Sequence, residues 1–168
     1  MSGFATSPRT LGKAVALHTP VHFDAGLVDR LLTEQRELNA SFASLVARFG
    51  SDPEAAELAV RACSARMVEV RRTEALWLYP VIARAVDGDV EAQQQFVQMR
   101  LVMLRLARRT LRLLDDFAQA VRLGIGANAA ADRVAEALAE YWQRNQSQIY
   151  PLYELIGTRR RDDTRRAG

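Results

Sequence analysis

The stretch EALWLYPVI at residues 74–82, together with its counterpart NQSQIYPLY at residues 145–153, decides how this chain folds. Each copy has an apolar residue, a tyrosine and a proline followed by more apolar residues, inside a helical pattern. Each also carries a polar residue six positions before its proline, Glu74 in the first copy and Asn145 in the second. A proline inside a helix cannot donate to the preceding turn, so Pro80 predicts a kink late in a long helix. The repetition indicates an ancient duplication of a helix pair.

Apolar residues recur at three- and four-residue spacing along four long segments, which predicts four amphipathic helices. We expect them at residues 24–49, 53–86 and 90–123, and from the turn at 124–128 to Ile156. Capping residues support these starts, since Asp24 precedes the first helix and Asp52 and Asp89 precede the next two. Short turns between long helices predict an all-α, up-down-up-down four-helix bundle. On the second helix, the spacing places Val70, Glu74, Trp77 and Val81 on the inward face.

A chain of 168 residues suits one domain. We expect an N-terminal arm at residues 1–23 with a short helix at 10–17, a bundle at 24–157, and a basic disordered tail at 158–168. The apolar runs are too short for a membrane helix, and the first 22 residues have no signal-peptide core. The single cysteine, Cys63, excludes an internal disulfide and fits a reducing compartment, so we expect a cytoplasmic protein.

The net charge of +3 comes almost entirely from arginine. Four arginines on the third helix form one broad patch, which predicts either a solvated face or a surface for an acidic partner: Arg105, Arg108, Arg109 and Arg112. Nucleic acid is a poor candidate, because the arginine-rich tail also holds Asp162 and Asp163 and has no aromatic residue to stack on bases. The apolar surface of the third helix is wider than one core-facing stripe, so dimerisation of the chain through this helix is an alternative to a monomer.

Three polar residues interrupt apolar stripes on three different helices: Gln35, Glu74 and Asn145. Tyr141 and Gln146 flank Asn145. An unpaired buried polar group costs on the order of 1–3 kcal/mol, so these side chains should meet one another or a ligand. One interpretation is a structural plug that fixes the register of the bundle, or Glu74 paired with Arg66 or Arg100; the other is a binding site.

These positions carry a resemblance to the hemerythrin-like (HHE) family, which has a di-iron site inside a four-helix bundle. The matching segments are Glu34-Gln35-Arg36-Glu37, then Val70, Glu74 and Leu78-Tyr79-Pro80, and finally Tyr141, Gln146 and Tyr150-Pro151. The resemblance implies histidine ligands where this chain has Gln35, Val70 and Tyr141, and another near residues 99–103, where it has none. Only the carboxylate of Glu74 is kept. The interpretation is a scaffold that has lost its metal, with no metal and no cofactor expected.

The chain is also similar to the bacterial regulator-of-sigma-D family (Rsd/AlgQ), a cytoplasmic helical bundle of about this length. The similar segments are LVDRLL at 27–32, REL at 36–38, MVE at 67–69, Leu78-Tyr79, and EAL at 136–138. This resemblance implies binding to the main sigma factor of RNA polymerase without a metal.

Catalysis is not expected, because the only histidines, His18 and His22, lie in the N-terminal segment, where Pro20 separates them. No Ser or Cys therefore has a neighbouring base, and no glycine-rich phosphate loop is present. The leading hypothesis is a non-enzymatic regulatory or protein-interaction module with an unknown protein partner. The alternatives are a sigma-factor-binding transcription regulator, or a small-molecule sensor that uses the vacated site at Gln35, Glu74, Tyr141 and Asn145.

Overall fold

The computed structural model describes the backbone of residues 22–166 and the side chains of residues 22–159. All the regular elements of this part of the chain are helices and none is a strand, which confirms the all-α prediction. The elements are α1 (Leu27–Val46), α2 (Pro53–Thr73), the π-helical turn η1 (Glu74–Leu78), α3 (Tyr79–Ala85), α4 (Val90–Leu123), α5 (Ala127–Arg144), the π-helical turn η2 (Asn145–Ile149) and α6 (Tyr150–Arg166). Because η1 joins α2 to α3 and η2 joins α5 to α6, these elements form four long helices.

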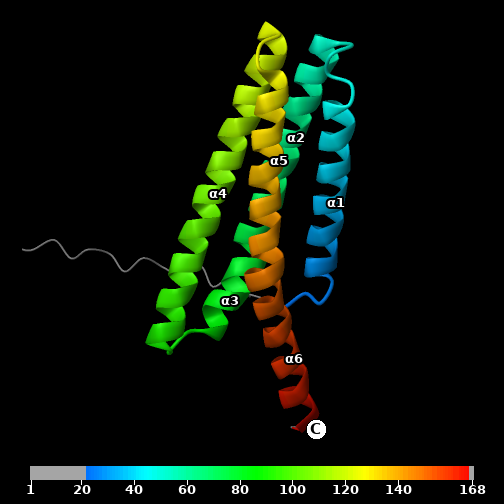
Figure 1. Cartoon of the computed structure of the whole chain (residues 1–168). Helices are drawn as coiled ribbons and strands as arrows, with labels where there is room; N and C mark the ends of the chain where they lie inside the picture. Colours follow the sequence, from blue (N-terminus) through cyan, green and yellow to red (C-terminus); the bar gives the residue numbers. More distant parts are fainter. Residues whose placement is uncertain (1–21, 167–168) are drawn as a thin grey trace, which may run out of the picture.

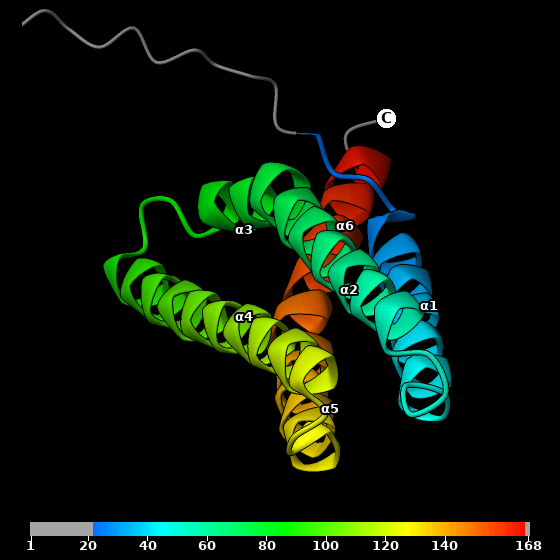
Figure 2. The same ribbon diagram turned by 90° about the horizontal axis from the view of Figure 1, so that it is seen from above.

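The helices pack side by side around a shared apolar core. The α1–α2 and α4–α5 connections lie at one end of the molecule and the α3–α4 connection lies toward the other (Figure 1). Helix α2 packs against α1 and α4, and α5 packs against α4 (Figure 2). None of the described helices combines the length and the apolarity that a membrane span requires.

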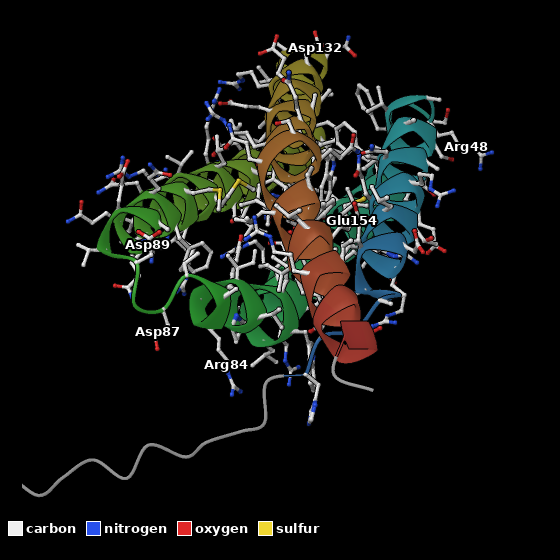
Figure 3. The ribbon with its side chains drawn as sticks, turned by 90° about the horizontal axis from the view of Figure 1, so that it is seen from below. Arg48, Arg84, Asp87, Asp89, Asp132 and Glu154 are labelled. Atoms are coloured by element: carbon white, nitrogen blue, oxygen red, sulfur yellow. The ribbon has the colours of Figure 1, made fainter. Side chains whose placement is uncertain are left out.

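Capping side chains set the helix starts. The Asp52 carboxylate accepts a hydrogen bond from Ala55 N at 3.0 Å, and the Asp89 carboxylate accepts one from Ala92 N at 3.0 Å. Asp89 lies in the α3–α4 connection (Figure 3), and the predicted bounds of the third helix are confirmed. The first helix instead begins at Leu27, after its predicted start. Asp24 does not cap it, because its carboxylate accepts from Gly26 N at 2.9 Å and pairs with Arg30.

The two π turns directly precede the two tyrosine–proline pairs. Tyr79 N donates to the carbonyl of Glu74, and Tyr150 N donates to the carbonyl of Asn145, five residues back in each case. A π turn holds one more residue than an α turn, so it rotates the following residues by about 100° relative to a continuous α-helix. Trp77, predicted to face inward, is 57% exposed. Leu78 is fully buried in its place, because the extra residue changes the register of the helix.

The last helix also differs from its prediction, since α6 continues past Ile156 to Arg166, through most of the segment predicted to be a disordered tail. No proline follows Pro151, and arginine is a good helix former, so nothing in the local sequence stops the helix. The helix expected at residues 10–17 and His18 lie outside the described residues.

The start of the described chain is anchored on α6. The Phe23 ring stacks on the Tyr153 ring with centroids 4.8 Å apart. The Tyr153 hydroxyl accepts from Asp24 N at 2.9 Å and donates to Asp24 O at 3.1 Å. Gly157 leaves room for the Phe23 ring, since a Cβ at this position would lie only 1.9 Å from Phe23 Cζ.

Candidate functional site: a buried polar cluster and an arginine surface

A carboxylate in the middle of the bundle holds together the core polar cluster, which we define as Arg71, Glu74, Tyr79, Tyr141 and Asn145. Glu74 has no exposed surface, and both of its oxygens accept hydrogen bonds. Oε2 accepts from Tyr141 Oη at 2.5 Å and from Arg71 Nη1 at 3.0 Å. Oε1 accepts from Asn145 Nδ2 at 2.9 Å. The cluster therefore surrounds one carboxylate with donors from both halves of the chain.

The π turns account for this convergence. Glu74 is the first residue of η1 and Asn145 is the first residue of η2, so the two occupy equivalent positions in the two copies of the repeated stretch. Both side chains are fully buried and bond directly to one another. π turns occur frequently at functional sites, where the extra residue redirects a side chain.

Arg71 is the cationic partner of Glu74, whereas the sequence interpretation named Arg66 or Arg100. Arg66 instead pairs with Glu37 of α1 at 3.0 Å. Arg100 lies over the ring of Tyr79, with its guanidinium carbon 5.4 Å from the ring centroid. A signal for Arg71 was available, because Arg71 and Glu74 are three residues apart, a spacing at which helix side chains are neighbours.

Burial dominates the electrostatics of the cluster. It raises the pKa of the Glu74 carboxyl above its ordinary value, although hydrogen bonds from Tyr141, Arg71 and Asn145 oppose the rise. Burial and the charge of Glu74 raise the pKa of the Tyr141 hydroxyl. Burial on its own would lower the pKa of Arg71, but its neighbours Tyr141, Tyr79 and Glu74 raise it overall, so this guanidinium stays charged.

Two buried polar atoms near the second π turn have no partner among the described residues: the Asn145 side-chain oxygen and the Tyr150 hydroxyl. Tyr150 occupies the position equivalent to Tyr79, but only the Tyr79 hydroxyl is within hydrogen-bonding reach of Arg71, at 3.2 Å. The two halves of the chain therefore place their tyrosines differently in the same core.

The structure brings together only part of the predicted site. Glu74, Tyr141 and Asn145 meet, and Val70 is buried beside them on α2 without a polar role. Gln35 is largely buried and accepts a hydrogen bond from Gln146 Nε2 at 2.9 Å. Gln146 itself is exposed, so it lies at the edge of the bundle rather than in the core, where the sequence placed it. The reason is that Gln146 directly follows Asn145, and adjacent residues of a helix face different directions.

The four arginines predicted as a partner surface are all exposed on α4. Arg109 pairs with Glu140 of α5 at 3.0 Å. The other three, which we call the α4 arginine surface, have no ion pair with a described residue: Arg105, Arg108 and Arg112. Together with Leu111 they line an open surface hollow of about 470 Å³.

A surface hollow of about 780 Å³ lies between α1 and α2 near their connection, and no residue of the core polar cluster lines it. Within the part of the chain that the structure describes, no three His, Cys, Asp or Glu side chains are grouped to hold a metal ion. Charged side chains such as Arg84 and Asp132 point outward from the helices (Figure 3).

Comparisons with protein-family models, with curated proteins and with solved structures each found no match.

Proposed function

We propose that this chain is a non-enzymatic protein-interaction module, built on an up-down-up-down four-helix bundle, that binds an acidic surface of a partner protein through the α4 arginine surface. The observation that carries the proposal is the set of three exposed arginines without a described acidic partner, beside an open hollow. Arginine is favoured in protein interfaces because its planar guanidinium can bond a carboxylate through two parallel hydrogen bonds.

The core polar cluster supports a structural role rather than catalysis. Its one carboxylate has no exposed surface, and both carboxylate oxygens already accept hydrogen bonds from the hydroxyl, guanidinium and amide groups of neighbouring side chains. A reacting group must be reached by a substrate, and Glu74 is not accessible to one. For the same reason we favour the plug interpretation over a small-molecule sensor built on Gln35, Glu74, Tyr141 and Asn145.

The donor set of the cluster also does not fit the di-iron centre that the hemerythrin-like resemblance implies. Gln35, Val70 and Tyr141 stand where that resemblance implies histidine. The guanidinium of Arg71 lies 3.0 Å from the one carboxylate, and its positive charge opposes a second cation there. We infer that the bundle kept the scaffold of such proteins and replaced the metal with an internal ion pair.

The test compares two charge reversals of equal size. One variant carries Arg108→Glu and Arg112→Glu on the α4 arginine surface. The matched control carries Arg84→Glu and Arg133→Glu, which are exposed arginines of α3 and α5 without a described ion pair. Immobilised wild-type and variant chains are incubated with extract of the native host at physiological salt, and the bound proteins are identified by mass spectrometry.

We expect the wild type and the control to retain the same acidic partner and the α4 variant to lose it. Equal retention by all three chains would contradict the proposal. Recovery of the main sigma factor would select the regulator-of-sigma-D alternative. Binding of a labelled DNA duplex that the α4 variant loses, with no protein partner, would identify nucleic acid as the ligand and refute the proposal.

A further inference from the structure

A second surface feature lies directly against the core polar cluster. We call it the α2–α4 groove; it has a volume of about 240 Å³. Its polar side is formed by Arg71, Tyr79 and Arg100, and its apolar side by Val97, Leu101 and Leu104, with Ala75 between them. It shares none of its lining residues with the hollow at the α4 arginine surface.

The charge in this groove is one-sided. Both guanidinium carbons lie close to the ring of Tyr79, that of Arg71 5.8 Å and that of Arg100 5.4 Å from its centroid. No acidic side chain lines the groove, and Arg100 has no ion pair with a described residue. The lining of the groove therefore presents two guanidinium groups and no acidic side chain, with the Arg71 guanidinium also paired to the buried Glu74 carboxylate behind it.

Arg71 can bond a ligand without leaving the cluster. Its hydrogen bonds to Glu74 and Tyr79 both leave from Nη1, whereas a guanidinium carries three further N–H donors on Nε and Nη2. Its side chain is 18% exposed and lines the groove, while its Nη1 holds Glu74. Arg100 is exposed and can approach from the α4 side.

The apolar side of the groove restricts the chemistry of the part of the ligand that lies beyond its charged group. Val97 and Leu101 are 50% and 40% exposed and offer an apolar wall to a ligand in the groove. The groove is small, about 240 Å³, and open to solvent, so it suits a small ligand. A carboxylate with a short aliphatic chain matches the charge, the apolar wall and the volume together.

From this arrangement we propose that the α2–α4 groove is a binding site for a small free organic carboxylate with a short apolar chain. Its carboxylate bonds to Arg71 and Arg100, and its chain packs on Val97, Leu101 and Leu104. Since Arg71 also bonds Glu74, occupation of the groove acts directly on the core polar cluster. The site does not rest on the protein partner proposed above.

The probe is hexanoate, and hexanol is the uncharged control of the same chain length. Binding to the full chain is measured by NMR chemical-shift titration. The variants are Arg100→Gln, which removes one cation, and Leu101→Asp, which puts a carboxylate on the apolar wall. Arg122→Gln is the matched control, because it removes an exposed arginine of the same helix that lines neither the groove nor the α4 arginine surface.

We expect hexanoate to bind the wild type and Arg122→Gln equally, and Arg100→Gln on the order of tenfold more weakly, because a charge-assisted hydrogen bond is lost. Leu101→Asp should abolish binding, and hexanol should bind at least about tenfold more weakly than hexanoate to the wild type. The proposal is overturned if hexanoate does not bind the wild type, or if hexanol binds as tightly. Equal weakening by Arg100→Gln and Arg122→Gln would also overturn it, since that result reports general surface charge. Binding of an acidic peptide but not of hexanoate would assign the groove to a protein partner instead.

Discussion

The side-chain amide of Asn145 donates a hydrogen bond 2.9 Å long to the carboxylate of Glu74, and each of these residues opens a π turn. The two stand at equivalent positions of the repeated stretch, six residues before Pro80 and Pro151. The direct bond therefore joins the two halves of the bundle at corresponding points. The stability of the fold should depend on this junction.

Replacing Glu74 with alanine should destabilise the protein strongly. The change leaves the Arg71 guanidinium without its anionic partner and removes the acceptor of Tyr141 and Asn145. Breaking a buried ion pair costs about 3–5 kcal/mol of unfolding free energy. Urea unfolding followed by circular dichroism measures the loss. Glu69→Ala is the control, since Glu69 faces Arg72 on the surface at 3.8 Å and its loss should change stability by less than about 1 kcal/mol. Equal effects of the two changes would refute the internal ion pair.

The stability should also depend on pH through Glu74. Its pKa is raised above the ordinary 4.5 by burial, so the folded chain holds a proton that the unfolded chain has released. The contribution of Glu74 to the unfolding free energy is therefore fully present below pH 4.5 and is lost as pH rises through the folded-state pKa. Within that window the loss is about 1.4 kcal/mol for each pH unit.

The measurement compares the wild type with Glu74→Gln by urea unfolding at several pH values upward from the ordinary pKa. Glutamine cannot titrate, so the stability difference between wild type and variant should shift steadily against the wild type as pH rises. The Arg71 and Tyr141 groups keep one protonation state over this range, because the pKa of each is raised further above it. A difference that instead shifts in favour of the wild type would mean that the folded-state pKa is lowered.

The tyrosines of the core should respond in opposite ways to the loss of their hydroxyl groups. Tyr150→Phe removes a buried hydroxyl that has no described partner, so stability should stay the same or rise by about 1 kcal/mol. Tyr141→Phe removes a donor to the Glu74 carboxylate and should cost roughly 1.5–3 kcal/mol. Thermal unfolding of both variants checks this contrast. A similar loss from both would show that the Tyr150 hydroxyl has a partner in solution.

Gly157→Ala should detach the Phe23 ring from α6. The new methyl group would lie 1.9 Å from Phe23 Cζ, so the ring must leave its stack on Tyr153. Overpacking of this kind costs about 1–3 kcal/mol. Gly50→Ala is a matched control, because no atom lies within 4 Å of a Cβ there. In a Phe23→Ala background Gly157→Ala should have little effect, and an undiminished loss there would assign the effect to the helix itself.

The parts of the fold that follow from local chemistry were predictable. The limits of α4 follow from a capping aspartate at Asp89 and from Gly124, whose φ of +67° ends the helix in the left-handed region. The burial of Glu74 and Asn145 followed from their place in apolar stripes. The π turns were not predicted, because residue spacing assumes a constant rise and rotation along a helix. This one omission displaced Trp77 from the expected inward face to the surface.

The partner of Glu74 was missed for a related reason. Arg71 directly follows Val70, which the spacing places on the core face, so the spacing does not place Arg71 on that face. In the structure its guanidinium reaches back into the bundle from a partly exposed position. The aliphatic part and the charged group of a long basic side chain often lie in different environments. The spacing of residues along a helix indicates only the face on which the Cα lies.

Because each π turn contains one extra residue, neither of the two long helices could become a continuous α-helix without losing its core packing. Deleting Ala75 would let η1 close as ordinary α-helix and restore shorter backbone hydrogen bonds. The same deletion would turn Leu78, Val81 and Ile82, all without exposed surface, away from the core. A homologous chain that lacks one of these insertions could keep its packing only by substituting the whole apolar face that follows. The number of residues in η1 and in η2 is therefore as strongly constrained as residue type.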